Sequence, residues 1–197
     1  MQYLDELRGK IARYFDPAGK IADEDEQLVS PSQRYRCAVS LYRQAGAEWN
    51  WQVARAVISL GATGAEIARI TCEDDRFWHC WLERPDGDYL ICSEALTGQT
   101  VVDLRSGTVA SYAVSDDEFI WTDRQPAPGQ RRLAVIGCYW ACPYELRVYD
   151  CAQPLSLPLP AIQTVALLAN NEAFGGWIDD HSLRLVGGDG AARIIAI

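Results

Sequence analysis

"RPDGDYLICSE", residues 84–94, and "TVVDLRSG", residues 100–107, together contain the unit from which most of this chain is built. Pro-Asp-Gly is a turn sequence, because proline fixes φ and glycine accepts backbone conformations that other residues avoid. A short apolar run follows the turn, and a second β-rich run ends at Asp103 before another turn. Short runs of this kind, separated by Gly, Pro and Asp, predict antiparallel strands.

The same turn and strand recur along the chain. "SPSQRYRCAVSL" begins at Ser30 and "APGQRRLAVIG" begins at Ala127. When Pro31, Pro85 and Pro128 are aligned, an apolar run follows each of them, and the prolines lie 54 and 43 residues apart. A period of roughly 40–50 residues is typical of the blades of a β-propeller.

A second signal precedes the turn and confirms the period. "DDRFWHCW" (74–81), "DDEFIW" (116–121) and "NNEAFGGW" (170–177) each place a pair of acids or amides before a phenylalanine and a tryptophan. The two signals divide the chain into four units. The predicted strands, unit by unit, are 27–29, 35–41, 53–60 and 66–70; 77–81, 89–94, 100–104 and 109–114; 119–122, 133–136, 145–149 and one after residue 160; and 174–178, 182–186 and 192–197.

This repeat resembles that of WD-type and TolB-like β-propeller proteins over about residues 26–197, although the Gly-His and Trp-Asp pairs are missing. The resemblance implies an all-β fold of about four propeller-like blades, each a four-stranded antiparallel unit. An open, curved meander is the main alternative, and a β-sandwich is the third. The last unit lacks its outer strand, and an exposed sheet edge is usually covered.

The first 25 residues differ from the rest. "YLDELRGKIARYF" (3–15) places Leu4, Leu7, Ile11 and Tyr14 at helical spacing, which predicts one amphipathic helix with a single apolar stripe. An acidic linker, "DEDE" (23–26), follows. We therefore expect a helix and linker over 1–25 and a single β-repeat domain over 26–197. The helix is predicted to be a lid on the core, and residues 1–29 to cover the open edge of the fourth unit.

Composition limits the function. The 197-residue chain is 49% hydrophobic and has a net charge of −9, with a pI of about 4.7. Such a surface repels nucleic-acid phosphates, so we expect no nucleic-acid binding and favour a protein partner that is basic. No apolar run approaches the roughly 18 residues of a membrane span, and the first residues lack the pattern of a signal peptide. We therefore expect a cytoplasmic protein without membrane contact; the oligomeric state stays open.

Catalytic and metal-binding motifs are weak. "AVIGCYWACPYELRVYD" (134–150) has cysteines four apart, which is neither a zinc pattern nor a redox pair. Its interpretation is a packed hairpin loop or a ligand loop. The two histidines, His79 and His181, have no partner motif. We expect reduced cysteines, no metal, no cofactor and no catalytic residue.

The resemblance assigns a candidate site. In such propellers, the loop between a blade's second and third strands shares one face with the loop that enters the next blade. That face would combine aromatic anchors with an acidic rim, which is typical of protein-binding surfaces. We predict a non-enzymatic protein-binding module, most concretely an immunity or inhibitor protein for a basic partner. An enzyme or small-ligand sensor on the same face is the alternative. Glu73 and Glu118 lie in these loops, and the predicted binding residues are Trp49, Trp51, Asp74, Asp75, Asp116, Asp117, Tyr139, Trp140 and Tyr144.

Overall fold

The structure is a computed structural model that describes residues 2–22, 24–44, 51–113, 119–140, 144–167 and 172–197. The chain divides into two compact units, Met1–Ser115 and Asp116–Ile197, and each is described here by itself. In the described residues the only α-helix lies before residue 26, and the regular structure after it is β.

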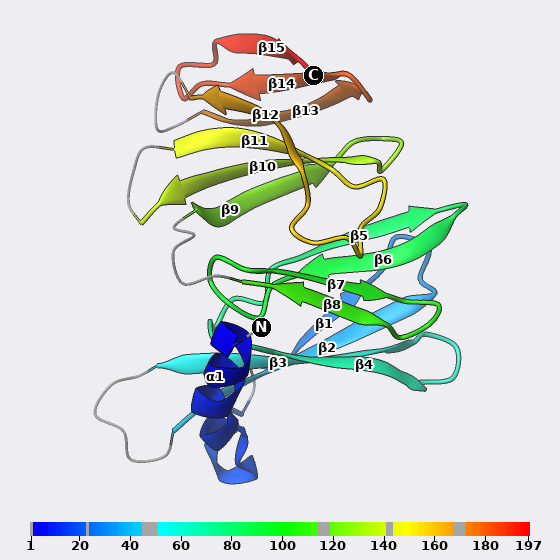
Figure 1. Cartoon of the computed structure of the whole chain (residues 1–197), viewed down its shortest axis with the longest axis vertical. Coiled ribbons are helices and arrows are strands. Elements are labelled where there is room, and N and C mark those ends of the chain that lie inside the picture. The colour runs from blue at the N-terminus through cyan, green and yellow to red at the C-terminus, as the bar shows by residue number, and fades with distance from the viewer. Residues whose placement is uncertain (1, 23, 45–50, 114–118, 141–143, 168–171) are drawn as a thin grey trace. The chain divides into compact units, whose positions relative to one another are not determined.

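The first unit consists of one helix and two antiparallel sheets (Figure 1). Helix α1 (Gln2–Ile11) continues into two short 3-10 turns, η1 (Ala12–Phe15) and η2 (Pro17–Gly19). In each sheet, every strand pairs with the next strand along the chain. The first sheet contains β1 (Glu26–Val29), β2 (Tyr35–Arg43), β3 (Gln52–Leu60) and β4 (Glu66–Cys72), and the second contains β5 (His79–Arg84), β6 (Gly87–Cys92), β7 (Gln99–Asp103) and β8 (Val109–Tyr112).

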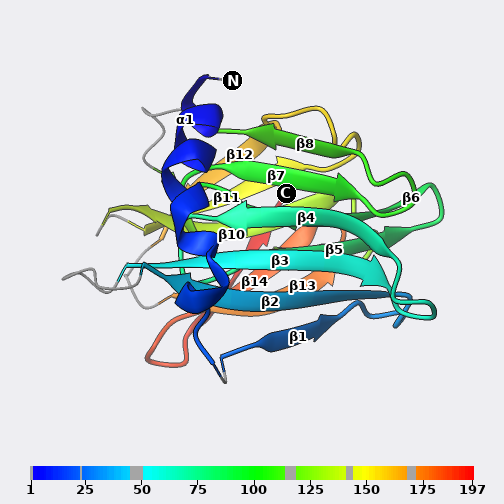
Figure 2. The same ribbon diagram turned by 90° about the horizontal axis from the view of Figure 1, so that it is seen from below.

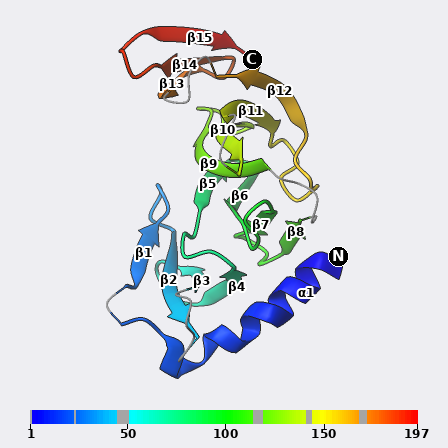
Figure 3. The same cartoon turned by 90° about the vertical axis from the view of Figure 1, so that its left-hand side faces the viewer.

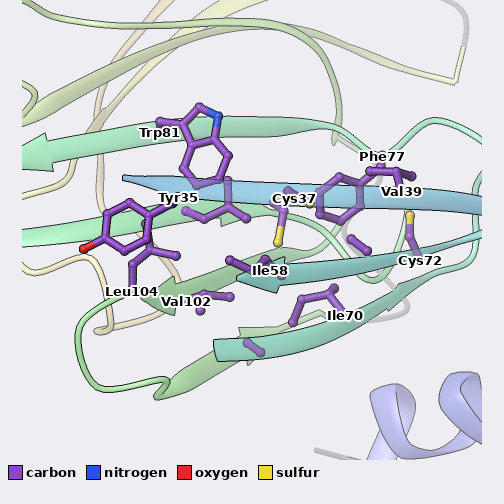
Figure 4. Packing of buried hydrophobic residues seen from close by; sticks show 14 of the residues in the cluster. Tyr35, Cys37, Val39, Ile58, Ile70, Cys72, Phe77, Trp81, Val102 and Leu104 are labelled. Carbon is purple, nitrogen blue, oxygen red and sulfur yellow. The ribbon is translucent and has the colours of Figure 1, made fainter. Parts of the chain in front are cut away.

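Alternation along the strands produces the core between these two sheets. In β2, Tyr35, Cys37 and Val39 are buried, while Arg36 between them is exposed. Successive side chains of a strand point to opposite faces, so one face of β2 is apolar. Figure 4 shows this face packed with residues from the other strands and from the 72–77 connection.

A buried carboxylate joins the two sheets at the Pro-Asp-Gly turn. The Asp88 side chain is fully buried and accepts hydrogen bonds from both terminal nitrogens of Arg34 at 3.0 and 3.1 Å. Arg105 Nε and the Tyr35 hydroxyl each donate to it at 2.9 Å. Burial alone would raise the pKa of Asp88, but the hydrogen bonds from Arg105 and Tyr35 and the charge of Arg34 outweigh it and lower that pKa. The turn that marks the repeat therefore also carries an ionic link between β2 and β6.

Helix α1 lies across the strand ends of the first unit (Figure 2). Its buried residues are Leu4, Leu7 and Ile11, as the helical spacing predicts, whereas Tyr14, predicted on the same stripe, lies in η1 and is only partly buried. They pack with Tyr42, Val53, Ala95 and Ala113, so the helix is a lid on the core. Residues 26–29, predicted to help cover the last unit's edge, form the edge strand β1 of the first sheet.

The second unit repeats the arrangement with one strand fewer (Figure 3). Ala134, Ile136, Leu146 and Val148 pack with Leu183 and Leu185 of the neighbouring sheet. Its larger sheet contains β9 (Phe119–Pro126), β10 (Arg132–Tyr139), β11 (Tyr144–Asp150) and β12 (Ala161–Ala166), and its smaller sheet contains β13 (Ala173–Asp179), β14 (Ser182–Val186) and β15 (Ala192–Ala196).

The predicted fold class is confirmed. The described residues form antiparallel sheets of four, four, four and three strands, in the order that the repeat predicts, with one helix before them. The main differences are at strand ends. Strand β10 continues to Tyr139 and β11 begins at Tyr144, because Cys138 and Tyr144 still pair across the hairpin. The predicted loop at 137–144 is thus shorter than expected.

Candidate functional site

Trp51 is the most distinctive exposed side chain of the first unit. It lies just before β3, and 58% of its surface is exposed. Its indole Nε1 donates a hydrogen bond to the backbone oxygen of Glu73 at 2.8 Å. The bond restricts the ring although solvent surrounds much of it, so Trp51 presents a large apolar surface at little further cost in conformational entropy.

The segment that holds Trp51 is itself anchored. Glu73 follows the end of β4, and its backbone N–H donates to the oxygen of Glu94 at 3.0 Å. Its side-chain Oε1 accepts a hydrogen bond from the N–H of Leu96 at 2.7 Å. The connection between the two sheets is therefore fixed at Glu73 by contacts on both backbone and side chain.

Two further carboxylates follow Glu73. Asp74 is half-buried and Asp75 is exposed. Burial raises the pKa of Asp74, and the neighbouring Asp75 raises it further. Like charges held close together favour binding of a cation or protonation of one of them. The sequence predicted that Trp51, Asp74 and Asp75 share a face, and the bond between Trp51 and Glu73 places the tryptophan beside this acidic segment.

A groove of about 270 Å³ lies between α1 and Trp51. Leu7 and Ile11 contribute apolar surface, while Lys10 and Arg13 bring positive charge to the helical side. The guanidinium of Arg13 lies 5.5 Å from the centre of the Tyr14 ring. The groove is lined by Tyr3, Leu7, Lys10, Ile11, Arg13, Tyr14, Trp51 and Glu73.

The helical wall was missed by sequence reasoning, which treated the helix only as a lid. A signal was present: Tyr3, Leu7 and Lys10 are spaced by four and three residues and so share one side of α1. Burial raises the pKa of Tyr3, and the negative charge of Glu73 adds to the effect. Tyr3 thus lies near the acidic segment in space although 70 residues separate them in sequence.

The predicted residues of the second unit occupy the β10–β11 hairpin. Trp140 is 68% exposed and has a positive φ of 60°. Tyr139 donates its hydroxyl to Glu145 Oε1 at 2.8 Å, and Arg147 Nε donates to the same oxygen at 2.6 Å. The guanidinium of Arg147 also lies 3.7 Å from the centre of the Phe119 ring. Tyr139 therefore belongs to a hydrogen-bonded cluster on the hairpin, and Trp140 extends from its tip.

Only some of the residues predicted to form one binding face belong to the part of the chain that the structure describes. Trp49, Asp116 and Asp117 lie outside the described residues. Trp51, Asp74 and Asp75 belong to the first unit, and Tyr139, Trp140 and Tyr144 belong to the second. Their union into one surface stays a prediction.

Within the described residues, no three His, Cys, Asp or Glu side chains are grouped as metal ligands. Cys138 and the five other described cysteines are buried and form no disulfide, while Cys142 lies outside the described part. His79 stacks on Phe77, and Nδ1 of His181 lies 2.8 Å from a terminal nitrogen of Arg132. No helix among the described residues has the length and apolar character needed to cross a bilayer.

Comparison with known proteins identifies the fold. No known protein family and no curated protein matches the sequence. Among solved structures, the C-terminal WD40 domain of Sif2 matches with a TM-score of 0.56 at 14% identity, over 87% of this chain and 45% of that one. Sqt1 from Chaetomium thermophilum matches with a TM-score of 0.55 at 14% identity, over 89% and 44%. A eukaryotic initiation factor matches with a TM-score of 0.54 at 16% identity, over 86% and 41%.

The fold of this chain is similar to that of WD40 β-propeller domains. This agrees with the repeat that the sequence predicts. The chain spans less than half of the length of these solved structures.

Proposed function

We propose that this protein is a non-enzymatic protein-binding module and that its docking site is the groove between α1 and Trp51. The observation that carries the proposal is Trp51 itself, which is 58% exposed yet hydrogen-bonded in place beside an apolar groove. Tryptophan is enriched among the residues that dominate binding energy at protein interfaces. A fixed tryptophan loses little further freedom when a partner covers it.

The charges near the groove support a basic partner. Glu73, Asp74 and Asp75 follow one another beside Trp51, and the whole chain has a net charge of −9. Lys10 and Arg13 on the helical wall would bind a carboxylate of the same partner. A net negative surface increases the rate at which a cationic protein associates. The most concrete form of the proposal is an inhibitor or immunity protein that covers the working surface of a cationic effector.

The alternative of an enzyme or small-ligand sensor has less support. The groove of about 270 Å³ is smaller than the roughly 300–1,000 Å³ of common small-molecule sites. It is also open to solvent along α1, and Lys10 and Arg13 on that side are exposed.

Photo-cross-linking followed by calorimetry would test the docking site. A benzophenone amino acid at position 14, which lines the groove, would capture the partner for identification by mass spectrometry. With the purified partner, we expect Trp51→Ala to weaken binding by about 2 kcal/mol or more, because it removes the anchor. Leu60→Ala is the matched control, since Leu60 is an exposed apolar residue at the other end of β3.

Equal affinities of wild type and Trp51→Ala would exclude the groove as the docking site. The charge of the partner is tested separately with Asp74→Asn and Asp75→Asn. We expect these variants to lower the affinity and to reduce its dependence on salt, because exposed ion pairs are screened. An affinity that rises in these variants would contradict a basic partner and leave the role of Trp51 in place.

A further inference from the structure

The β13–β15 sheet ends in an open edge. The other three sheets have four strands each, whereas this sheet has the order β13-β14-β15. Among the described residues, β15 pairs only with β14. No described strand therefore takes the position beside β15 that a fourth strand occupies in the β9–β12 sheet (Figures 1 and 3).

The pairing register shows which backbone groups face the open edge. The N–H of Ile197 donates to the oxygen of His181, and the N–H of Gly187 donates to the oxygen of Ala191. Between these bonds the register is unbroken, with Ile194 opposite Arg184. Since hydrogen-bonded and non-hydrogen-bonded pairs alternate in antiparallel strands, Arg193 and Ile195 bond to β14. The N–H and C=O groups of Ala192, Ile194 and Ala196 point away from β14.

Side chains do not protect this edge. Ile194 is 65% exposed, and the side chains of Ala192 and Ala196 on either side of it are exposed too. Natural sheets usually protect an open edge with lysine, proline or a bulge, and β15 has none of these. Its one charge, on Arg193, is neutralised by the Glu172 carboxylate at 2.8 and 2.9 Å. The oxygen of Ala196 accepts a hydrogen bond from Gln163 Nε2 at 3.0 Å, which leaves Ala192 and Ile194 as the open centre.

We propose that β15 is a self-association edge, at which a second copy of the chain pairs its own β15 antiparallel to the first. The sizes of Ala192, Ile194 and Ala196 are small, large and small in both directions along the strand. A two-fold axis at Ile194 therefore places Ile194 opposite Ile194 of the second copy, and Ala192 opposite Ala196. The two Ile194 residues then exchange N–H to C=O hydrogen bonds, and their side chains cover each other. Two three-stranded sheets become one six-stranded sheet.

The occupant is a second copy because the edge is complementary to itself. No exposed charge on β15 opposes its own image, and the antiparallel direction follows from the symmetry. The interface is small and formed by one strand from each copy. The net charge of −9 on each chain repels the other copy, so the dimer is strengthened by salt. The inference concerns the second unit and is independent of the groove in the first.

Sedimentation equilibrium of the full chain, from micromolar to millimolar concentration, tests the proposal. We expect a monomer–dimer equilibrium whose dissociation constant falls as salt rises from 50 to 500 mM. Ile194→Lys places two like charges together and should raise the dissociation constant at least tenfold. Ile194→Pro removes an outward N–H without removing a bond to β14, so it should weaken the dimer to a similar extent. Ile178→Lys is the control, because Ile178 is 54% exposed on the same sheet but lies on β13.

Circular dichroism and melting temperature establish that each variant is folded before it is compared. A wild-type chain that stays monomeric up to millimolar concentration would overturn the proposal. This holds even if the edge then proves to bind a foreign peptide, because the proposed occupant is a second copy of the chain. A dimer that Ile178→Lys weakens as much as Ile194→Lys would also overturn it, because the sheet face and not its edge would then form the contact. An unchanged dimer in Ile194→Pro would exclude backbone pairing.

Discussion

At the scale of single residues, Asp88 shows how the repeat's turn does more than reverse the chain. Its carboxylate is fully buried and is held by Arg34, Arg105 and Tyr35. Each arginine is about half exposed, so solvent screens part of the attraction. The energetic importance of Asp88 comes mainly from the donors that would be left without an acceptor if it were lost.

We predict that Asp88→Asn lowers the free energy of unfolding by about 2–3 kcal/mol, because a neutral amide with one oxygen cannot satisfy the four donor groups that Arg34, Arg105 and Tyr35 direct at the carboxylate. Urea unfolding at pH 7 measures this. Glu66→Gln is the control: Glu66 pairs with Arg69 at 2.7 Å, but both side chains are half exposed, so the loss of this pair should change the free energy of unfolding much less than Asp88→Asn does. Equal costs for the two variants would show that Asp88 is an ordinary surface ion pair.

In contrast to Asp88, Trp140 is predicted to contribute little to stability. It is 68% exposed and has a φ of 60°, a region that costs a non-glycine residue roughly 1–2 kcal/mol. We expect Trp140→Ala to change stability by less than about 1 kcal/mol, and Trp140→Gly to be neutral or stabilising. Trp81→Ala, in the core at 9% exposure, should cost about 3–5 kcal/mol. A loss at Trp140 as large as that at Trp81 would show that the hairpin tip is structural.

Buried thiols set the alkaline limit of stability. Burial, with a smaller contribution from Glu26, raises the pKa of Cys37 to about 12, and burial raises the pKa of Cys72 to about 12 as well. An unfolded thiol loses its proton near pH 8.5. The stability that these two thiols contribute is therefore fully present below that pH and is lost as the pH rises toward 12, because the thiols of the unfolded chain ionise first.

We predict a fall in unfolding free energy between pH 9 and 11 that is smaller in Cys37→Ala than in wild type, after each curve is referred to its own value at pH 7. Guanidinium unfolding at each pH measures it. Lys and Tyr titrations act on both proteins alike. Parallel pH curves for the two proteins would contradict burial of the Cys37 thiol.

At the scale of elements, α1 is held by charge as well as by its apolar stripe. Arg8 forms two hydrogen bonds of 2.7 Å with Glu94, whose side chain is 5% exposed. The hydroxyl of Ser111 donates to the same carboxylate at 2.6 Å. A ten-residue helix is marginal in isolation, so these tertiary contacts are what keep it formed.

We predict that Arg8→Met costs about 2–3 kcal/mol and increases amide exchange throughout α1, because a buried carboxylate loses its cation. Asp5→Asn on the same helix is the control: its side chain is 71% exposed, and the change should cost less than about 0.5 kcal/mol. The comparison fails if exchange in α1 is unchanged in Arg8→Met.

Elements were predictable where local pattern determines them. Strands such as β2 and β4 alternate buried and less buried residues, and turns with proline or glycine separate many of the strands, so the order of the strands follows from the repeat. The start of β5 was not predictable in this way. It was expected at Phe77 and lies at His79, because β6 ends at Cys92, which pairs with His79. Phe77 is buried in the core although it precedes the strand.

The site was predictable only in part, because its helical wall depends on docking of α1. The acidic segment and Trp51 follow from the repeat, since both lie at ends of strands. The contribution of Lys10 and Arg13 requires that a helix lie beside a loop 60 residues away, and no local pattern encodes such a contact.

At the scale of the whole molecule, the proposed docking site for a partner is the groove between α1 and Trp51. The fold supplies two anchored walls, and the sequence supplies an aromatic anchor with an acidic segment beside it. Hydrogen exchange of the purified complex, compared with the free protein, tests this most directly. We expect slower exchange at residues 3–14 and 72–76 when the partner is bound. Unchanged exchange in both segments, with protection confined to the β10–β11 hairpin, would contradict it.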